Sequence, residues 1–107
     1  MEKKEKSQTQ EWDEAEIKTL PFNLIKVLEI FIKEEKKFLD SPDIKKELKL
    51  ADKQVGAIMS AFRKVAKGRR PLVYSVFRVG RGNRWIIEPR YLNIVRKVIS
   101  KLEPYLK

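Results

Sequence analysis

Two long stretches of the chain repeat apolar residues at helical spacing. In "TLPFNLIKVLEIFIKEEKK" (19–37) the apolar positions form one stripe, and Pro21 suits a first-turn position. In "DKQVGAIMSAFRKVAK" (52–67) they share one face at about 100° per residue, and Gly68 follows where helices commonly end. The inward positions of this second helix are Val55, Ile58, Met59, Phe62, Val65 and Ala66.

Shorter patterns lie between and after these helices. The apolar pair at 38–39 is a candidate for a brief strand, and "SPDIKKEL" (41–48) predicts a two-turn helix with Ser41 as its N-cap. Two β-rich runs, 69–79 and 84–89, surround the sequence "GRGN". Glycines between two such runs predict a β-hairpin.

The N-terminal sixteen residues lack a helical or strand pattern of any length. We therefore predict a flexible, partly acidic arm over 1–16 and a folded domain over 17–107. The segment "EWDEAEIKTL" leaves two alternatives open. It forms either a short helix or an ordered arm, with Trp12 and Ile17 docked on the body of the domain.

Charge changes this picture, because the cations are concentrated in one segment. The net charge is +10, from 25 Lys and Arg against 15 Asp and Glu. Residues 53–84 hold nine cations and no Asp or Glu, whereas residues 11–16 carry a charge of −4. A segment of one sign favours a site for a polyanion, and the alternative is a solvated basic face.

The missing residue types exclude several function classes. Without Cys and His, disulfides and thiol chemistry are excluded, and we expect no metal site. General acid–base or nucleophilic chemistry usually needs a His, a Cys or paired carboxylates in a pocket, so we expect no enzyme and no cofactor or small-molecule ligand. No apolar run is long enough to span a membrane, and no secretory signal is present. A cytoplasmic, nucleoid-associated location is the expectation.

The order of predicted elements resembles the winged-helix family of DNA-binding domains over residues 19–88. The resemblance rests on element order, lengths and patterning, without an invariant motif. It implies an α+β winged helix-turn-helix fold, with a three-helix core, a β-hairpin wing and an added C-terminal helix. The helix-turn-helix pair would be 41–49 and 52–67, the second being the recognition helix. The wing would be 72–88, with its arginine-rich part at 76–86.

If the apolar face of 52–67 is buried, the opposite face carries small residues between cations. The first turn of a recognition helix reaches base edges, and small residues fit the major groove. Cations near the helix end would instead contact phosphates. The predicted DNA-binding residues of this region are Lys53, Gln54, Ala57, Ser60, Arg63, Lys64, Lys67, Arg69 and Arg70. The alternative is that the small residues serve helix packing alone.

The tip of the predicted hairpin crowds three arginines around two glycines. Arg78, Arg81 and Arg84, with Asn83, would approach the minor groove or its phosphates, which relieves the repulsion among them. The alternative for one arginine is that Arg78 stacks on Trp85 across the hairpin.

The last segment, 89–107, predicts a helix whose apolar residues recur at spacings of 3, 4, 3 and 4. These residues are Leu92, Val95, Ile99, Leu102 and Leu106. Further apolar positions widen this seam beyond what packing on a small domain needs, which predicts a homodimer through this helix. The alternative is a wide monomer core that includes Trp12.

Together these patterns predict a dimeric transcriptional regulator that binds double-stranded DNA. A sequence-tolerant architectural or chromatin protein, a protein-interaction module of a multi-subunit assembly and an RNA-binding protein are the alternatives. The acidic residues at 11–16 add one further hypothesis: they fold onto the basic face and compete with DNA.

Overall fold

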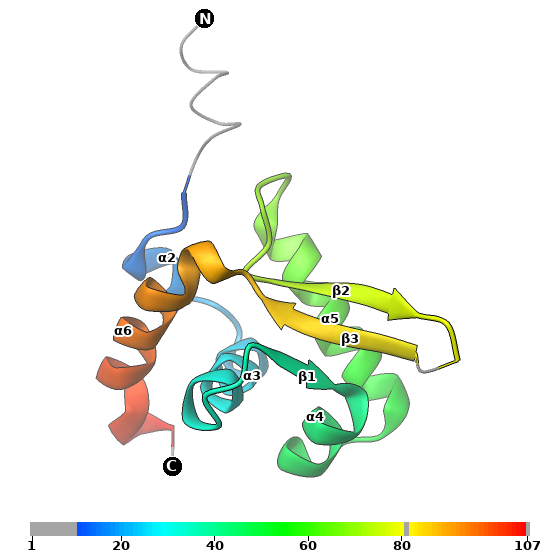
Figure 1. The fold of residues 1–107 in the computed structure, drawn as a ribbon. Coiled ribbons are helices and arrows are strands. Elements are labelled where there is room, and N and C mark those ends of the chain that lie inside the picture. The colour runs from blue at the N-terminus through cyan, green and yellow to red at the C-terminus, as the bar shows by residue number, and fades with distance from the viewer. Residues whose placement is uncertain (1–10, 81, 107) are drawn as a thin grey trace, which may run out of the picture.

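A three-stranded antiparallel sheet and the helices around it form the fold in the computed structural model, which describes residues 11–80 and 82–106 (Figure 1). The elements are α2 (Glu14–Lys18), α3 (Phe22–Lys33), β1 (Phe38–Asp40), α4 (Ser41–Leu48), α5 (Asp52–Ala66), β2 (Val73–Arg78), β3 (Gly82–Ile87) and α6 (Leu92–Leu102). Short 3₁₀ turns at Pro89–Tyr91 and Glu103–Tyr105 flank α6. The predicted α+β class, hairpin and C-terminal helix are confirmed.

The sheet has the strand order β1-β3-β2. The hairpin of β2 and β3 closes at the pair Arg78–Gly82, and β1 joins the free side of β3, where Leu39 pairs with Trp85. Gly80 and Gly82 adopt left-handed φ values of 77° and 80° in the turn, which residues with a Cβ rarely adopt. Helix α5 lies behind the sheet in Figure 1, and the other face has no helix in front of it.

The observed helix ends differ from the predicted ones by one or a few residues. Helix α4 has Asp40, not Ser41, at its N-cap, because the Asp43 carboxylate accepts a hydrogen bond from the Asp40 backbone N–H at 3.0 Å. Helix α5 ends at Ala66 and is followed by Lys67 with a left-handed φ of 51°. The last helix is shorter than predicted, because Pro104 cannot donate a backbone hydrogen bond and a 3₁₀ turn replaces the final helical turns.

One core joins the helices to the sheet. Its largest fully buried side chains are Phe31, Phe62, Ile17, Leu24, Leu28, Leu39, Ile44, Leu72, Ile87, Val27, Val95 and Val98. From α5, Val55, Met59, Phe62 and Ala66 are buried, while Ile58 and Val65 are half-buried at the edge. The predicted inward face of this helix is therefore confirmed.

Residues 11–16 differ from the flexible arm that we predicted. Trp12 is only 4% exposed, and its indole N–H donates to the Arg70 carbonyl at 2.9 Å. Asp13 caps α2 by accepting a hydrogen bond from the Glu16 N–H at 2.8 Å. The segment thus forms both alternatives at once, a short helix and a docked tryptophan. Residues 1–10 lie outside the described part of the chain.

The residues expected at a dimer interface lie in the core of their own chain. Val95, Ile99 and Leu106 are buried, and Leu92 and Leu102 pack against the core as half-buried side chains. Helix α6 runs beside α2 and α3 (Figure 1). These residues are covered within their own chain, because α2 supplies apolar cover that the pattern of the last helix alone cannot reveal. A homodimer itself stays a prediction. The wide monomer core that includes Trp12 is the arrangement observed.

Helix length also bears on membranes. The longest helix, α5, has 15 residues. Across residues 11–80 and 82–106, no helix combines the length and apolarity needed to cross a bilayer.

Candidate nucleic-acid interface

Helix α5 turns a polar face away from the core. Val55, Met59 and Phe62 are buried, so helical geometry directs the residues between them outward. The predicted residues on this helix and its C-cap are all exposed: Lys53, Gln54, Ala57, Ser60, Arg63, Lys64 and Lys67. Their exposure is confirmed, and their contact with DNA stays a prediction.

The cations of this face are not neutralised from within the protein. In the described part of the chain, no ion pair or hydrogen bond engages the side chains of Lys53, Arg63 and Lys64. Small side chains, Ala57 and Ser60, separate Lys53 from Lys64. The result is a low surface with uncompensated positive charge at both ends, a shape that suits the floor of a major groove.

A cavity of about 420 Å³ lies between α5 and the hairpin. Ser60, Arg63 and Lys64 line it from the helix, and Asn83 lines it from β3. The fold therefore brings four predicted residues, separated by up to 23 positions in the chain, to one concave surface. Tyr74 and Trp85 also line this groove, although the sequence had not marked Tyr74, whose place in an alternating strand gives no sign of which face it takes.

Gln54 has a structural task that limits its use in reading bases. Its side-chain oxygen accepts a hydrogen bond from the Ala51 backbone N–H at 2.8 Å, which caps the start of α5. A bidentate contact to adenine needs both the oxygen and the amide nitrogen of Gln. A bidentate contact of Gln54 to adenine would therefore cost α5 this cap.

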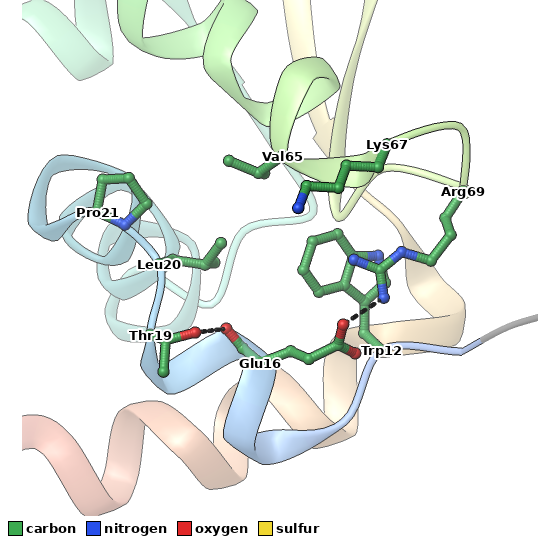
Figure 2. A pocket seen from close by; sticks show the side chains of 8 residues that line it. All are labelled: Trp12, Glu16, Thr19, Leu20, Pro21, Val65, Lys67 and Arg69. Carbon is green, nitrogen blue, oxygen red and sulfur yellow. Dashed lines mark hydrogen bonds and ion pairs between the residues drawn. The ribbon is translucent and has the colours of Figure 1, made fainter.

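Arg69 does not belong to the cationic surface. Its side chain is 9% exposed, and its Nη1 atom lies 2.7 Å from the Glu16 carboxylate. The guanidinium carbon lies 3.9 Å from the centroid of the Trp12 ring, as Figure 2 shows. The predicted phosphate contact of Arg69 is wrong, because the ordered segment before α3 supplies both an aromatic face and a counter-charge.

Lys67 and Arg70 are exposed but lie away from the groove. Lys67 extends over a separate pocket of about 520 Å³ that Trp12 and Glu16 also line (Figure 2). Its left-handed backbone turns it off the outward row of α5. Arg70 lies 3.4 Å from the Glu88 carboxylate. Neither residue is among those that line the groove between α5 and the hairpin.

A carboxylate from β1 compensates two of the three hairpin arginines. Asp40 Oδ1 accepts hydrogen bonds from Arg78 at 2.9 Å and from Arg84 at 3.2 Å. The sequence analysis missed Asp40, because the register that pairs it with Arg84 is a long-range feature of the sheet. The mutual repulsion that we inferred for these arginines is thus relieved inside the protein.

The stacking partner of the hairpin also differs from the one we expected. The Arg84 guanidinium carbon lies 3.8 Å from the centroid of the Phe38 ring, so Arg84 and Phe38 form the cation–π pair in place of Arg78 and Trp85. The Trp85 indole N–H lies 3.4 Å from the Ser41 hydroxyl. Arg81, which we also predicted to contact DNA, lies outside the described residues.

No family model, curated protein or solved structure matches this chain.

Proposed function

We propose that the chain is a winged-helix domain that binds double-stranded DNA through α5 and the β2–β3 hairpin. The element order α3, β1, α4, α5, β2 and β3 supports the winged-helix assignment. In this assignment α4 and α5 are the helix-turn-helix pair, α5 is the recognition helix and the hairpin is the wing. The observation that carries the proposal is the groove lined by Arg63 and Lys64 of α5, which have no partner in the described structure, and by Asn83 of the hairpin.

The proposed contact surface is smaller than the nine cations of the sequence suggested. Among residues 11–80 and 82–106, no side chain pairs with Lys53, Arg63 or Lys64, whereas Arg78 and Arg84 share the Asp40 carboxylate. Three phosphate contacts give a slope of log K against log salt of about −3. A larger set that included every cation of residues 53–84 would give a steeper slope.

One chain is the proposed binding unit, since the stripe expected to dimerise is part of the monomer core. A transcriptional regulator remains our first hypothesis for its role, and an architectural protein the second. Selection from random duplexes separates the two. A regulator discriminates between sites by about 4–10 kcal/mol, whereas an architectural protein discriminates hardly at all.

Fluorescence anisotropy with a labelled random-sequence duplex at several salt concentrations tests the proposal. We expect binding with a slope near −3, and each of the variants Arg63→Ala and Lys64→Ala should lower its magnitude by about 1. Arg96→Ala is the matched control: it removes from α6 an exposed arginine whose Nη1 lies 3.5 Å from the Asn93 side-chain oxygen. A slope near zero, or equal effects of the three variants, would overturn the proposal.

A further inference from the structure

Two apolar side chains stand exposed at the closed end of the hairpin. Phe77 is 70% exposed and Val79 is 91% exposed. Phe77 precedes the last paired position of β2, and Val79 lies in the turn beyond it. Large apolar side chains at such a tip gain nothing from the core of their own chain, and two of them side by side are candidates for contact with a surface outside the chain.

The alternation of the strands shows which way Phe77 faces. Val73, Ser75 and Phe77 share one face of β2, and Phe77 pairs with Asn83 of β3. Val73, Ser75 and Asn83 all line the groove against α5. Phe77 therefore lies on the face of the sheet that is turned toward α5, where Arg63 and Lys64 are. It extends the groove between α5 and the hairpin toward the tip.

The tip is a ribbon of two strands whose axes lie about 4.8 Å apart, so with its atomic radii it is wider than the minor groove of straight B-DNA, about 6 Å. It fits a minor groove only where a kink opens that groove, as in proteins that insert a wedge between base pairs. At Gly80 and Gly82 an added Cβ would meet no described atom within 4 Å outside the neighbouring residues, so no other part of the fold packs against these two positions in the Cβ direction. Their left-handed φ values hold the chain in a tight reversal.

The charge around the tip favours nucleic acid as the occupant. Residues 53–84 contain no Asp or Glu. Arg78 ends β2 and Arg84 is the third residue of β3, and both lie on the face of the hairpin opposite Phe77. In the described structure, the carboxylate of Asp40 pairs with Arg78 and Arg84 of the hairpin. One negative charge is therefore shared by two positive charges. An apolar tip set between cations matches the minor-groove proteins that insert an apolar wedge between base pairs.

We infer that Phe77 and Val79 form an apolar wedge that enters the minor groove, unstacks one base step and kinks the duplex. This inference rests on the proposed function and adds a class of target: duplexes with a flexible pyrimidine–purine step, such as TA, under the hairpin. In this arrangement α5 occupies the adjacent major groove, and Arg78 and Arg84 keep their ion pairs with Asp40 on the opposite face of the hairpin. The kink expected from a wedge of this kind is about 20–90°.

Energy transfer between dyes at the two ends of a short duplex measures the kink directly. The full chain is added to a duplex with a central TA step and to one with an uninterrupted A-tract, and anisotropy on the same samples reports binding. We expect the wild type to shorten the end-to-end distance of the TA duplex. The double variant Phe77→Ala/Val79→Ala should bind without shortening it. Loss of the stacked aromatic weakens binding to the TA duplex by about 5- to 150-fold, with a smaller effect on the A-tract.

Controls keep the outcomes separate. Phe22→Ala and Tyr105→Ala remove exposed aromatic residues far from the hairpin and should leave the kink unchanged, and Phe77→Leu should preserve it. If the wild type binds but leaves the duplex straight, the wedge is wrong and the proposed function stands. If the wild type does not bind duplex DNA, the proposed function itself fails.

If the double variant kinks DNA as the wild type does, the inference is overturned. It is also overturned if the only defect of the double variant is loss of self-association in sedimentation, because the tip is then a protein-docking surface.

Discussion

The Arg69 guanidinium lies flat against the Trp12 indole, with its carbon 3.9 Å from the ring centroid. The contact joins the segment before α2 to the turn after α5, 57 positions along the chain. It explains why adjacent arginines differ: Arg69 is held by Trp12 and Glu16, whereas Arg70 is exposed.

Replacing Trp12 tests whether the N-terminal segment is part of the core. Trp12→Ala removes a buried ring and its hydrogen bond to the Arg70 carbonyl, which should lower the free energy of unfolding by about 3–5 kcal/mol. Urea denaturation followed by circular dichroism measures the change. Phe22→Ala, which removes an exposed ring, should change stability by less than about 0.5 kcal/mol. If the two variants lowered the free energy of unfolding equally, Trp12 would not be part of the core, and residues 11–16 would be the flexible arm that the sequence predicted.

Deleting residues 1–16 also has a new expected outcome. The hypothesis that acidic residues compete with DNA predicts tighter binding after this deletion. Since Trp12 and Glu16 support the fold, we expect a large loss of stability and no gain in affinity per folded molecule. Circular dichroism and anisotropy on the same preparation distinguish the two results. A stable protein with higher affinity would restore the competition hypothesis.

Arg69 and Arg63 should respond in opposite ways to the same substitution. Arg69→Ala breaks the 2.7 Å pair with Glu16 and the stack on Trp12, so it should lower the melting temperature and leave the salt slope of DNA binding unchanged. Arg63→Ala should leave the melting temperature unchanged and lower the slope by about 1. Thermal denaturation paired with anisotropy reads both quantities. A change of slope for Arg69→Ala would place this residue back among the phosphate contacts.

Asp40 sets a balance between stability and affinity in the hairpin. Asp40→Asn keeps the shape of the side chain but removes the charge that Arg78 and Arg84 share. We expect stability to fall by about 1 kcal/mol and DNA affinity to rise, with a slope steeper by about 1 to 2, because two arginines become available to phosphates. Glu34→Gln is the control, since it removes one exposed negative charge and frees no arginine. Lower affinity for Asp40→Asn would show that the ion pairs shape the hairpin for binding.

Glu14 makes part of the contact between α2 and α6 dependent on pH. Its carboxylate lies 2.7 Å from Lys101 Nζ, and this hydrogen bond lowers the pKa of Glu14 from the usual value of a glutamate. A lowered folded-state pKa gives stabilisation that is fully present above the unfolded-state pKa and is lost as the pH falls through the folded-state value. Glu14→Gln should thus melt slightly below the wild type at neutral pH, and the difference should vanish in strong acid. Glu103→Gln, which changes an exposed glutamate directly after α6, is the control. If the difference in melting temperature between Glu14→Gln and the wild type did not depend on pH, the ion pair with Lys101 would be excluded as its cause.

Helix α5 was predictable because both of its faces are encoded locally. Val55, Met59 and Phe62 repeat at helical spacing, and burying them determines where Lys53 and Lys64 point. The partners of the charged residues were not predictable in this way. Asp40 meets Arg84 through strand register, 44 positions away, and spacing along the chain says nothing about such a meeting.

The last helix shows a different limit of sequence patterns. Val95 and Ile99 form a wide apolar stripe, and the width of a stripe indicates how much surface is covered without identifying what covers it. The cover came from α2, a helix of 5 residues with Ile17 as its buried anchor. A helix of this length has too few apolar positions to show a helical pattern in the sequence, so its packing against α6 could not be predicted.

Strand β1 runs directly into α4, with Asp40 ending the strand and Ser41 opening the helix. Because β1 also pairs along β3, the hairpin cannot swing about its base without pulling on the helical pair. For the proposed duplex contact through α5 and the hairpin, this coupling predicts poor tolerance of targets in which a base pair is gained or lost between the two contacts.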